Sequence, residues 1–216
     1  MTTRFGILFF VLLASVALLD VRSKAMTAEH VTLAVQGRSN QTPWIAAHQS
    51  FVAITWGAST RGQTDVFVAI SRDGGATFGS PVQVNRAAGE ARLGGELPPR
   101  VALMPVRGGE PEIIVLWTAR TDTTQIKMAR SRDGGRTFTE ATALQAADAP
   151  GERGWPALAF DAEGAAHVIW LDHRGLARAK SDGATHDHKS STAYDGVAMA
   201  QRSGLYYARA GSSPAD

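Results

Sequence analysis

After about residue 30, apolar residues come in short runs that are separated by clusters of Gly, Pro, Asp and Ser. Runs such as Val52–Trp56 and Val66–Ser71 are rich in Val, Ile, Phe and Trp, which is typical of β-strands. Apolar residues at helical spacing do not occur beyond the first 25 residues. The pattern therefore predicts an all-β protein built from short strands.

The strand pattern is repeated along the chain. The octet SRDGGATF (Ser71–Phe78) returns as SRDGGRTF (Ser131–Phe138), 60 positions later. Other residues recur at similar spacing: Pro43, Pro99 and Pro156, and Trp56, Trp117 and Trp170. A period of 50 to 60 residues with four short strands is typical of a propeller blade. The predicted blades cover about residues 43–85, 99–145 and 156–216.

Each unit is expected to hold strands a to d. In the first unit these are Trp44–Ala47, Val52–Trp56, Val66–Ser71 and Val82–Val84. In the second they are Val101–Met104, Ile113–Trp117, Ile126–Ser131 and Ala141–Leu144. In the third, strands a, b and c are Ala157–Phe160, His167–Trp170 and Leu205–Arg209, with a polar insertion before the last. An alternative alignment places strand c at Leu176–Lys180 and an eroded octet at Ser181–His186.

About three blades do not close a ring, because propellers typically contain four to eight. An open stack of sheets also exposes edges that invite association. The simplest interpretation is an incomplete, N-terminal portion of a longer propeller, and a self-assembling partial propeller is the alternative. Val31–Val35 could supply a strand d to a closing blade.

Both octets match the pattern S-x-D-x-G-x-T-F, which resembles the Asp-box, or BNR repeat, of the sialidase superfamily. The matching residues are Ser71, Asp73, Gly75, Thr77 and Phe78, and Ser131, Asp133, Gly135, Thr137 and Phe138. The resemblance covers nearly all of the chain after the leader. It implies a sialidase-like β-propeller in which the boxes lie on the face away from the active site.

The composition of the octet also has a physical reason. Between strands c and d the chain must reverse, and Asp-Gly-Gly supplies residues that tolerate positive φ. The aspartate carboxylate can accept nearby backbone N–H groups and so fix the turn. Both aspartates are therefore expected to be structural.

The first 25 residues resemble a secretory leader. One positive charge in MTTR precedes a 15-residue apolar run, Phe5–Leu19, which is shorter than the roughly 20 residues of a membrane span. Ser23 and Ala25 provide small residues for cleavage after Ala25. The sequence thus predicts a signal-peptide helix at 1–25 and a secreted or periplasmic protein, with an uncleaved anchor as the alternative.

Removing the leader changes the electrostatic picture. The remaining chain has 19 basic and 19 acidic residues (22 minus 3 and 20 minus 1), so it lacks the basic excess of a nucleic-acid-binding protein. It has no cysteine, which excludes disulfides and a lipid-bearing cysteine after the leader. No nucleic-acid partner, and no membrane contact after cleavage, are expected; the oligomeric state stays open.

Strands in a blade alternate in direction, so successive connections alternate between the two ends. If the octets lie at one end, three polar stretches share the other: Asn85–Arg100, Gln145–Trp155 and Leu171–Gly204. Binding and catalytic residues concentrate in such loops. These stretches are rich in Arg, Glu, Asp and His.

The resemblance implies a cluster of arginines that holds a substrate carboxylate, with an Asp acid and a Tyr–Glu nucleophile pair. Planar guanidinium groups suit bidentate binding of a carboxylate. The substrate-binding candidates are Arg100, Arg86, Arg92, Arg153 and Arg174, and their alternative role is solubility. The Arg-Ile-Pro signature of the family is missing. No Tyr–Glu pair can be assigned, so the catalytic residues stay unknown; Tyr206 and Tyr207 are expected to be strand residues.

The polar insertion contains a weaker signal for a metal. Asp172, His173, His186 and His188 are ordinary ligand types for zinc or copper, but a solvated loop explains them as well. No metal or other cofactor is expected.

The sequence predicts an exported sialidase-like propeller that acts on extracellular glycans, an exo-sialidase-type glycoside hydrolase if it is catalytic. The alternatives are a non-catalytic propeller that binds a glycan, a protein or a metal, and an inactive fragment. A glycan or glycoconjugate is the expected partner.

Overall fold

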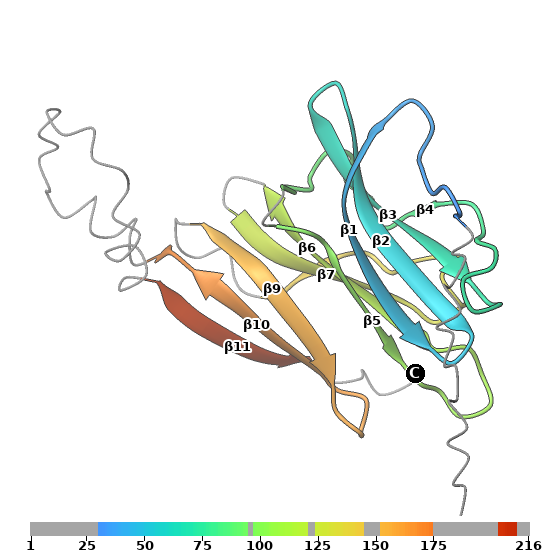
Figure 1. Cartoon of the computed structure of the whole chain (residues 1–216). Coiled ribbons are helices and arrows are strands. Elements are labelled where there is room, and N and C mark those ends of the chain that lie inside the picture. The colour runs from blue at the N-terminus through green and yellow to red at the C-terminus, as the bar shows by residue number, and fades with distance from the viewer. Residues whose placement is uncertain (1–29, 95–96, 121–123, 145–151, 175–202, 211–216) are drawn as a thin grey trace, which may run out of the picture. The chain divides into compact units, whose positions relative to one another are not determined.

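The structure, a computed structural model, describes residues 30–94, 97–120, 124–144, 152–174 and 203–210. These residues form an all-β protein with three antiparallel sheets, the arrangement of a partial β-propeller (Figure 1). The prediction of the fold class is confirmed. The predicted signal peptide, the alternative strand Leu176–Lys180, His186 and His188 lie outside the described residues.

The first two sheets each contain four strands in sequence order. The strands of the first sheet are β1 (Ser39–His48), β2 (Phe51–Thr60), β3 (Gln63–Ser71) and β4 (Val82–Gln83). Those of the second sheet are β5 (Arg100–Met104), β6 (Glu112–Arg120), β7 (Thr124–Ser131) and β8 (Thr142–Ala143). All eight strands overlap the predicted segments, and β1, β2 and β6 extend several residues further.

The third sheet contains β9 (Arg153–Phe160), β10 (Ala166–Asp172) and β11 (Gly204–Ala210) in the order β11-β10-β9. The partner of β10 is β11, with Ile169 opposite Tyr207 and Leu171 opposite Leu205. The placement of strand c at Leu205–Arg209 is therefore confirmed. Tyr206 and Tyr207 are strand residues, as predicted.

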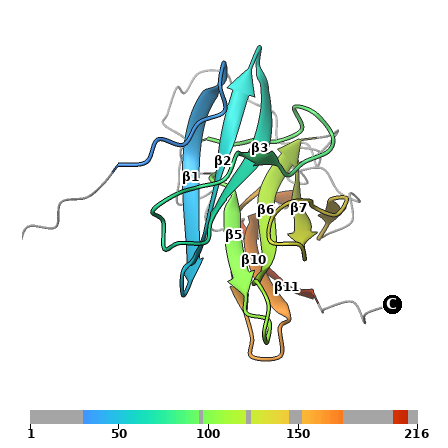
Figure 2. The ribbon, with the colours of Figure 1, turned by 90° about the vertical axis from the view of Figure 1, so that its right-hand side faces the viewer.

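Apolar side chains fill the spaces between consecutive sheets. One core cluster joins Val66 and Val68 of the first sheet to Val115 and Trp117 of the second. Another joins the second sheet to the third, and there Trp170 is buried. The inner strands β1, β5 and β9 contact one another in succession, and Figure 2 shows β5 beside β1. The second sheet thus buries both faces, which explains why β6 is a nearly continuous apolar run.

The Asp-box turns connect β3 to β4 and β7 to β8. Thr77 N–H donates to the Asp73 carboxylate at 2.9 Å, and Thr137 N–H donates to Asp133 at 2.9 Å. The threonine and serine hydroxyls of each box also donate to the same carboxylate. Because these hydrogen bonds favour the charged form, they lower the pKa of both aspartates to about 2. Both carboxylates are engaged inside their own turns.

Residues 31–35 form no strand with any described segment. Leu33 and Val35 instead pack on the face of the first sheet that looks away from the second, against Trp56 and Phe67. The expectation that this segment supplies strand d of a closing blade is not what the structure shows: it caps the first sheet. Within the described residues no helix has the length and apolarity needed to cross a membrane.

Candidate functional site

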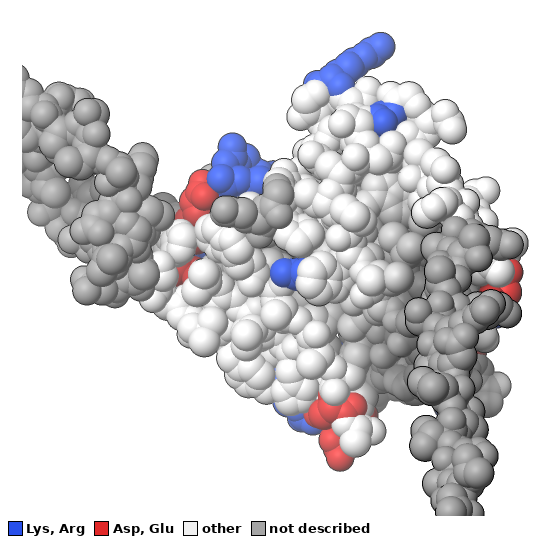
Figure 3. All heavy atoms as spheres, in the orientation of Figure 1, with Lys and Arg blue, Asp and Glu red and all other residues white. Residues whose placement is uncertain are grey.

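The end of the sheets opposite the Asp-box turns is called the upper end here. It contains the turn from β2 to β3, the described part of the link after β4 (residues 84–94), the end of β6 and the starts of β5, β7 and β9. Short bridges connect it across sheets, since Ala91 pairs with Ala119 and Glu90 with Thr64. In Figure 3, basic and acidic atoms lie against one another above β9 and β10.

Three of the five candidate arginines are held by carboxylates at this end. Arg153, the first residue of β9, is buried and donates to Asp172 at 3.1 Å and to the Thr124 carbonyl at 3.0 Å. Arg174 donates to the same Asp172 at 2.6 and 2.9 Å. Arg92 forms an ion pair with Glu152 at 2.7 Å.

These contacts keep the carboxylates of Asp172 and Glu152 in their charged form. Burial opposes ionisation of Asp172, but the hydrogen bonds from Arg174 and the nearby charge of Arg153 outweigh it and lower its pKa. The hydrogen bond from Arg92 likewise lowers the pKa of Glu152. Both carboxylates are therefore ionised at neutral pH and already paired with arginines, which suits positioning of loops and does not suit a general acid.

Arg100 differs from these three arginines. Its guanidinium lies over the Trp44 ring, 3.6 Å from the ring centroid, and its Nε donates to the Pro156 carbonyl at 2.9 Å. The residue thus joins the inner strands of all three sheets. Among the described residues no carboxylate forms an ion pair with Arg100, and its buried Nη1 has no hydrogen-bond partner. Arg100 is partly buried, and this burial lowers the pKa of its guanidinium.

Two backbone irregularities shape this region. Thr42 and Trp155, each directly before a proline, have φ of 53°. The pairing register of β1 shifts between Gln41 and Trp44, and that of β10 with β9 shifts between Ile169 and Leu171. Bulges of this kind change the direction in which a side chain points. They place Trp44 on Arg100, and the Trp155 ring at 5.3 Å from the ring of His173.

Sequence reasoning missed Trp44, Trp155 and Glu152. Trp44 and Trp155 each stand next to a proline, Pro43 and Pro156. Because a proline within a sheet is confined to edge strands and bulges, these two prolines could have indicated the bulges beside which both tryptophans lie. Glu152 had no local signal. Its role depends on Arg92, which lies far away in sequence.

The other predicted residues that the structure describes are Arg86 and the metal-ligand candidates Asp172 and His173. Arg86 reaches the Phe138 carbonyl at 3.4 Å, at the contact between the first and second sheets. Asp172 is held by two arginines, and the ring of His173 lies against the Trp155 ring in a tilted contact, at an interplanar angle of 44°. In the described part of the chain no three His, Cys, Asp or Glu residues come together in a way that could hold a metal ion.

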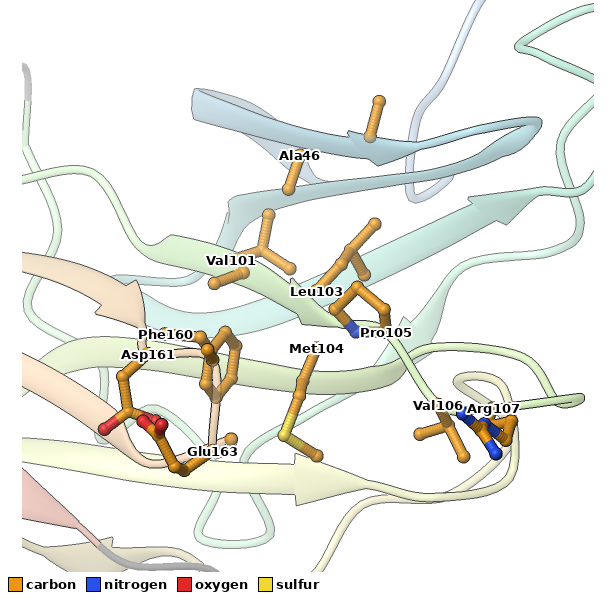
Figure 4. A pocket seen from close by; sticks show the side chains of 14 residues that line it. Ala46, Val101, Leu103, Met104, Pro105, Val106, Arg107, Phe160, Asp161 and Glu163 are labelled. Carbon is orange, nitrogen blue, oxygen red and sulfur yellow. The ribbon is translucent and has the colours of Figure 1, made fainter.

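A hollow lies at the lower end of the inner strands, near the turn from β9 to β10. It has a volume of about 910 Å³ and is lined by Ala46, Val101, Met104, Phe160 and Glu163, among others (Figure 4). Its walls contain both apolar and charged residues, and the carboxylate of Asp161, one of the charged residues, is already bound by His167 and Arg209.

The fold defines the class: an all-β partial propeller whose inner strands carry an aromatic residue and an arginine in contact. No family model matches the chain, and no curated protein matches it. Among solved structures it is similar to the GH93 α-L-arabinofuranosidase of Fusarium graminearum in complex with arabinobiose, with 15% identity and a TM-score of 0.46. The match covers 79% of this chain and 45% of that enzyme, so the chain spans less than half of its length.

Proposed function

We propose that the upper end of the inner strands binds an acidic glycan, with Arg100 as the group that holds the sugar carboxylate. The observation that carries the proposal is the state of Arg100: a partly desolvated cation with no carboxylate partner among the described residues. A positive charge in this state interacts strongly with an anion, because the surrounding dielectric is low.

Trp44 supports the choice of a sugar as the ligand. Its ring is 42% exposed although it lies on an inner strand, and one face already contacts Arg100. An exposed indole offers a flat apolar surface with a polar edge. A ligand with an apolar ring face and a carboxylate would contact both residues at once.

The two Asp-boxes favour a sialidase-like protein. Hydrolysis of sialosides is therefore the second candidate function. Hydrolysis needs a carboxylic acid near the bond that breaks. In the described residues Glu152 and Asp172 are both bound by arginines, so the geometry supports binding better than it supports catalysis. Export through the leader at 1–25 belongs to the same proposal, and N-terminal sequencing of secreted protein should then begin at Met26.

The test compares binding of sialosides with binding of neutral glycans on a glycan array, followed by titration. Arg100→Lys keeps the charge but loses the planar donor pair, and should raise Kd at least about tenfold. Arg107→Lys, at an exposed arginine after β5, is the matched control and should leave Kd unchanged. Equal affinity of the Arg100→Lys variant and the original chain would show that Arg100 does not hold the ligand.

A fluorogenic sialoside at about pH 5 to 7 separates the two candidate functions. Release of the fluorophore, lost in Arg100→Lys, would establish a hydrolase. Binding without release would establish a binding propeller. Neither binding nor release would refute both, and would favour an inactive fragment.

A further inference from the structure

Three arginines lie on one face of the second sheet, at its upper end. Arg100 is paired with Leu116 of β6, and the backbone N–H of Arg92 donates to the Thr118 carbonyl at 2.8 Å. Arg120 is the last residue of β6. Because side chains alternate along a strand, Leu116, Thr118 and Arg120 point to the same face. Leu116 packs towards the third sheet, so the arginines beside it face that sheet as well.

A β-bridge holds two of these arginines next to each other. Ala91 pairs with Ala119 in antiparallel orientation, and Arg120 N–H donates to the Glu90 carbonyl at 2.9 Å. In this register Arg92 and Arg120 are diagonal neighbours on one face, about 7–8 Å apart. The backbone therefore fixes two positive charges at a separation that one anion can bridge, and we call this pair the arginine clamp.

The carboxylate of Glu152 occupies the arginine clamp. It lies 2.7 Å from the Arg92 guanidinium and 3.7 Å from that of Arg120. The side chain of Glu152 is 52% exposed and that of Arg120 is 61% exposed, and ion pairs between such exposed groups contribute little to stability. Asp172 and Arg153 differ, because both side chains are fully buried and each would leave the other as an unpaired buried charge. Glu152 can thus be replaced by another anion, whereas Asp172 cannot.

The arginine clamp lies close to the site at Arg100. Leu116 and Thr118, which mark the two positions on β6, are two strand residues apart, or about 7 Å. On β9 the Pro156 carbonyl, which accepts from Arg100, follows Glu152 by four residues, an extended length of at most about 14 Å. The buried hydroxyl of Thr118, like Nη1 of Arg100, has no hydrogen-bond partner among the described residues. A short oligosaccharide can span this distance and supply acceptors along it.

We infer that the arginine clamp is a second anion subsite, which binds a further acidic group of the glycan that Arg100 holds. Without the glycan, Glu152 occupies the subsite as an internal ligand. The inference rests on the proposed function, because Arg100 makes the first contact, and it narrows the ligand class to oligosaccharides with at least two acidic groups. The incoming anion takes the place of the Glu152 carboxylate between Arg92 and Arg120.

The test compares two probes: sialyllactose, which has one carboxylate, and disialyllactose, in which a second sialic acid extends the first. Glu152→Gln removes the competing charge and should lower the Kd of disialyllactose at least about threefold. Arg120→Gln weakens the clamp and should raise that Kd at least about threefold. The Kd of sialyllactose should change less than about twofold in both variants, since one carboxylate reaches only Arg100.

Two controls separate the subsite from a general effect of charge. Arg61→Gln removes an exposed positive charge from the turn between β2 and β3, at the same end, and should leave both Kd values unchanged. In NMR spectra the side-chain carboxyl signal of Glu152 should shift when disialyllactose is added and stay in place with sialyllactose.

Each outcome bears on one of the two proposals. Tight binding of both probes that neither Glu152→Gln nor Arg120→Gln alters, or alters equally for both, would overturn the second subsite and leave the site at Arg100 standing. A Glu152 carboxyl signal that disialyllactose does not move would also overturn it. Absence of binding by either probe would overturn the proposed function, and the second subsite with it.

Discussion

Phe78 and Phe138 occupy the same position in the two Asp-boxes, but their packing environments differ. Phe138 is 7% exposed and belongs to the core between the first and second sheets. Phe78 is half-buried on the capped face of the first sheet. Replacement of each by alanine therefore measures the contribution of packing between sheets, because the turn itself is the same in both.

The magnitudes follow from burial. Full burial of a Phe side chain is worth about 1.5–3 kcal/mol, and the cavity left in a core brings the cost of Phe→Ala to about 3–5 kcal/mol. For Phe138→Ala we expect a loss of about 3–4 kcal/mol. For Phe78→Ala we expect about 1–1.5 kcal/mol, since half of the surface is already in water and no closed cavity forms.

Urea unfolding, followed by tryptophan fluorescence, gives both free energies of unfolding, provided that the m value does not change. Phe138→Leu is the control: it keeps most of the volume and should cost less than about 1.5 kcal/mol. Equal losses for the two alanine variants would refute the reasoning, because the first sheet would then contribute nothing to the environment of Phe138.

Two further predictions concern the same turns. Gly75→Ala should lower the free energy of unfolding by about 1–2 kcal/mol through its positive φ alone, since a Cβ there meets no other atom. Gly135→Ala should lower it measurably more, because its Cβ would lie 2.7 Å from the Ile70 side chain. Thermal unfolding of both variants measures the difference, and a larger loss of stability at Gly75 would contradict the packing. The pKa of Asp133 is lowered to about 2 from 3.8, so its charged form stabilises the fold above about pH 4, and that stabilisation is lost as the pH falls towards 2. Asp133→Asn should therefore show a smaller drop in Tm between pH 6 and pH 3 than the original chain, and an unchanged drop would mean that the turn does not depend on the charge.

Much of the fold could be predicted because it is encoded locally. Alternating apolar runs define strands, and Asp-Gly-Gly defines a turn, without reference to distant residues. The repeated octets then set the register of the units, so the sequence alone determined the strands and the order of the three sheets. It also placed Arg92, Arg100, Arg153 and Arg174 at the end of the sheets away from the Asp-boxes.

The tertiary structure decided which of those arginines is available. Arg153 meets Asp172 because β9 pairs with β10, and Arg92 meets Glu152 because distant segments of the chain fold together, whereas Arg174 lies two residues from Asp172. The contact of Arg100 with Trp44 and Pro156 spans 56 residues in each direction, and no local pattern encodes it. Pairing between charges depends on distances of a few ångströms in three dimensions, whereas sequence periodicity specifies only which face a residue occupies.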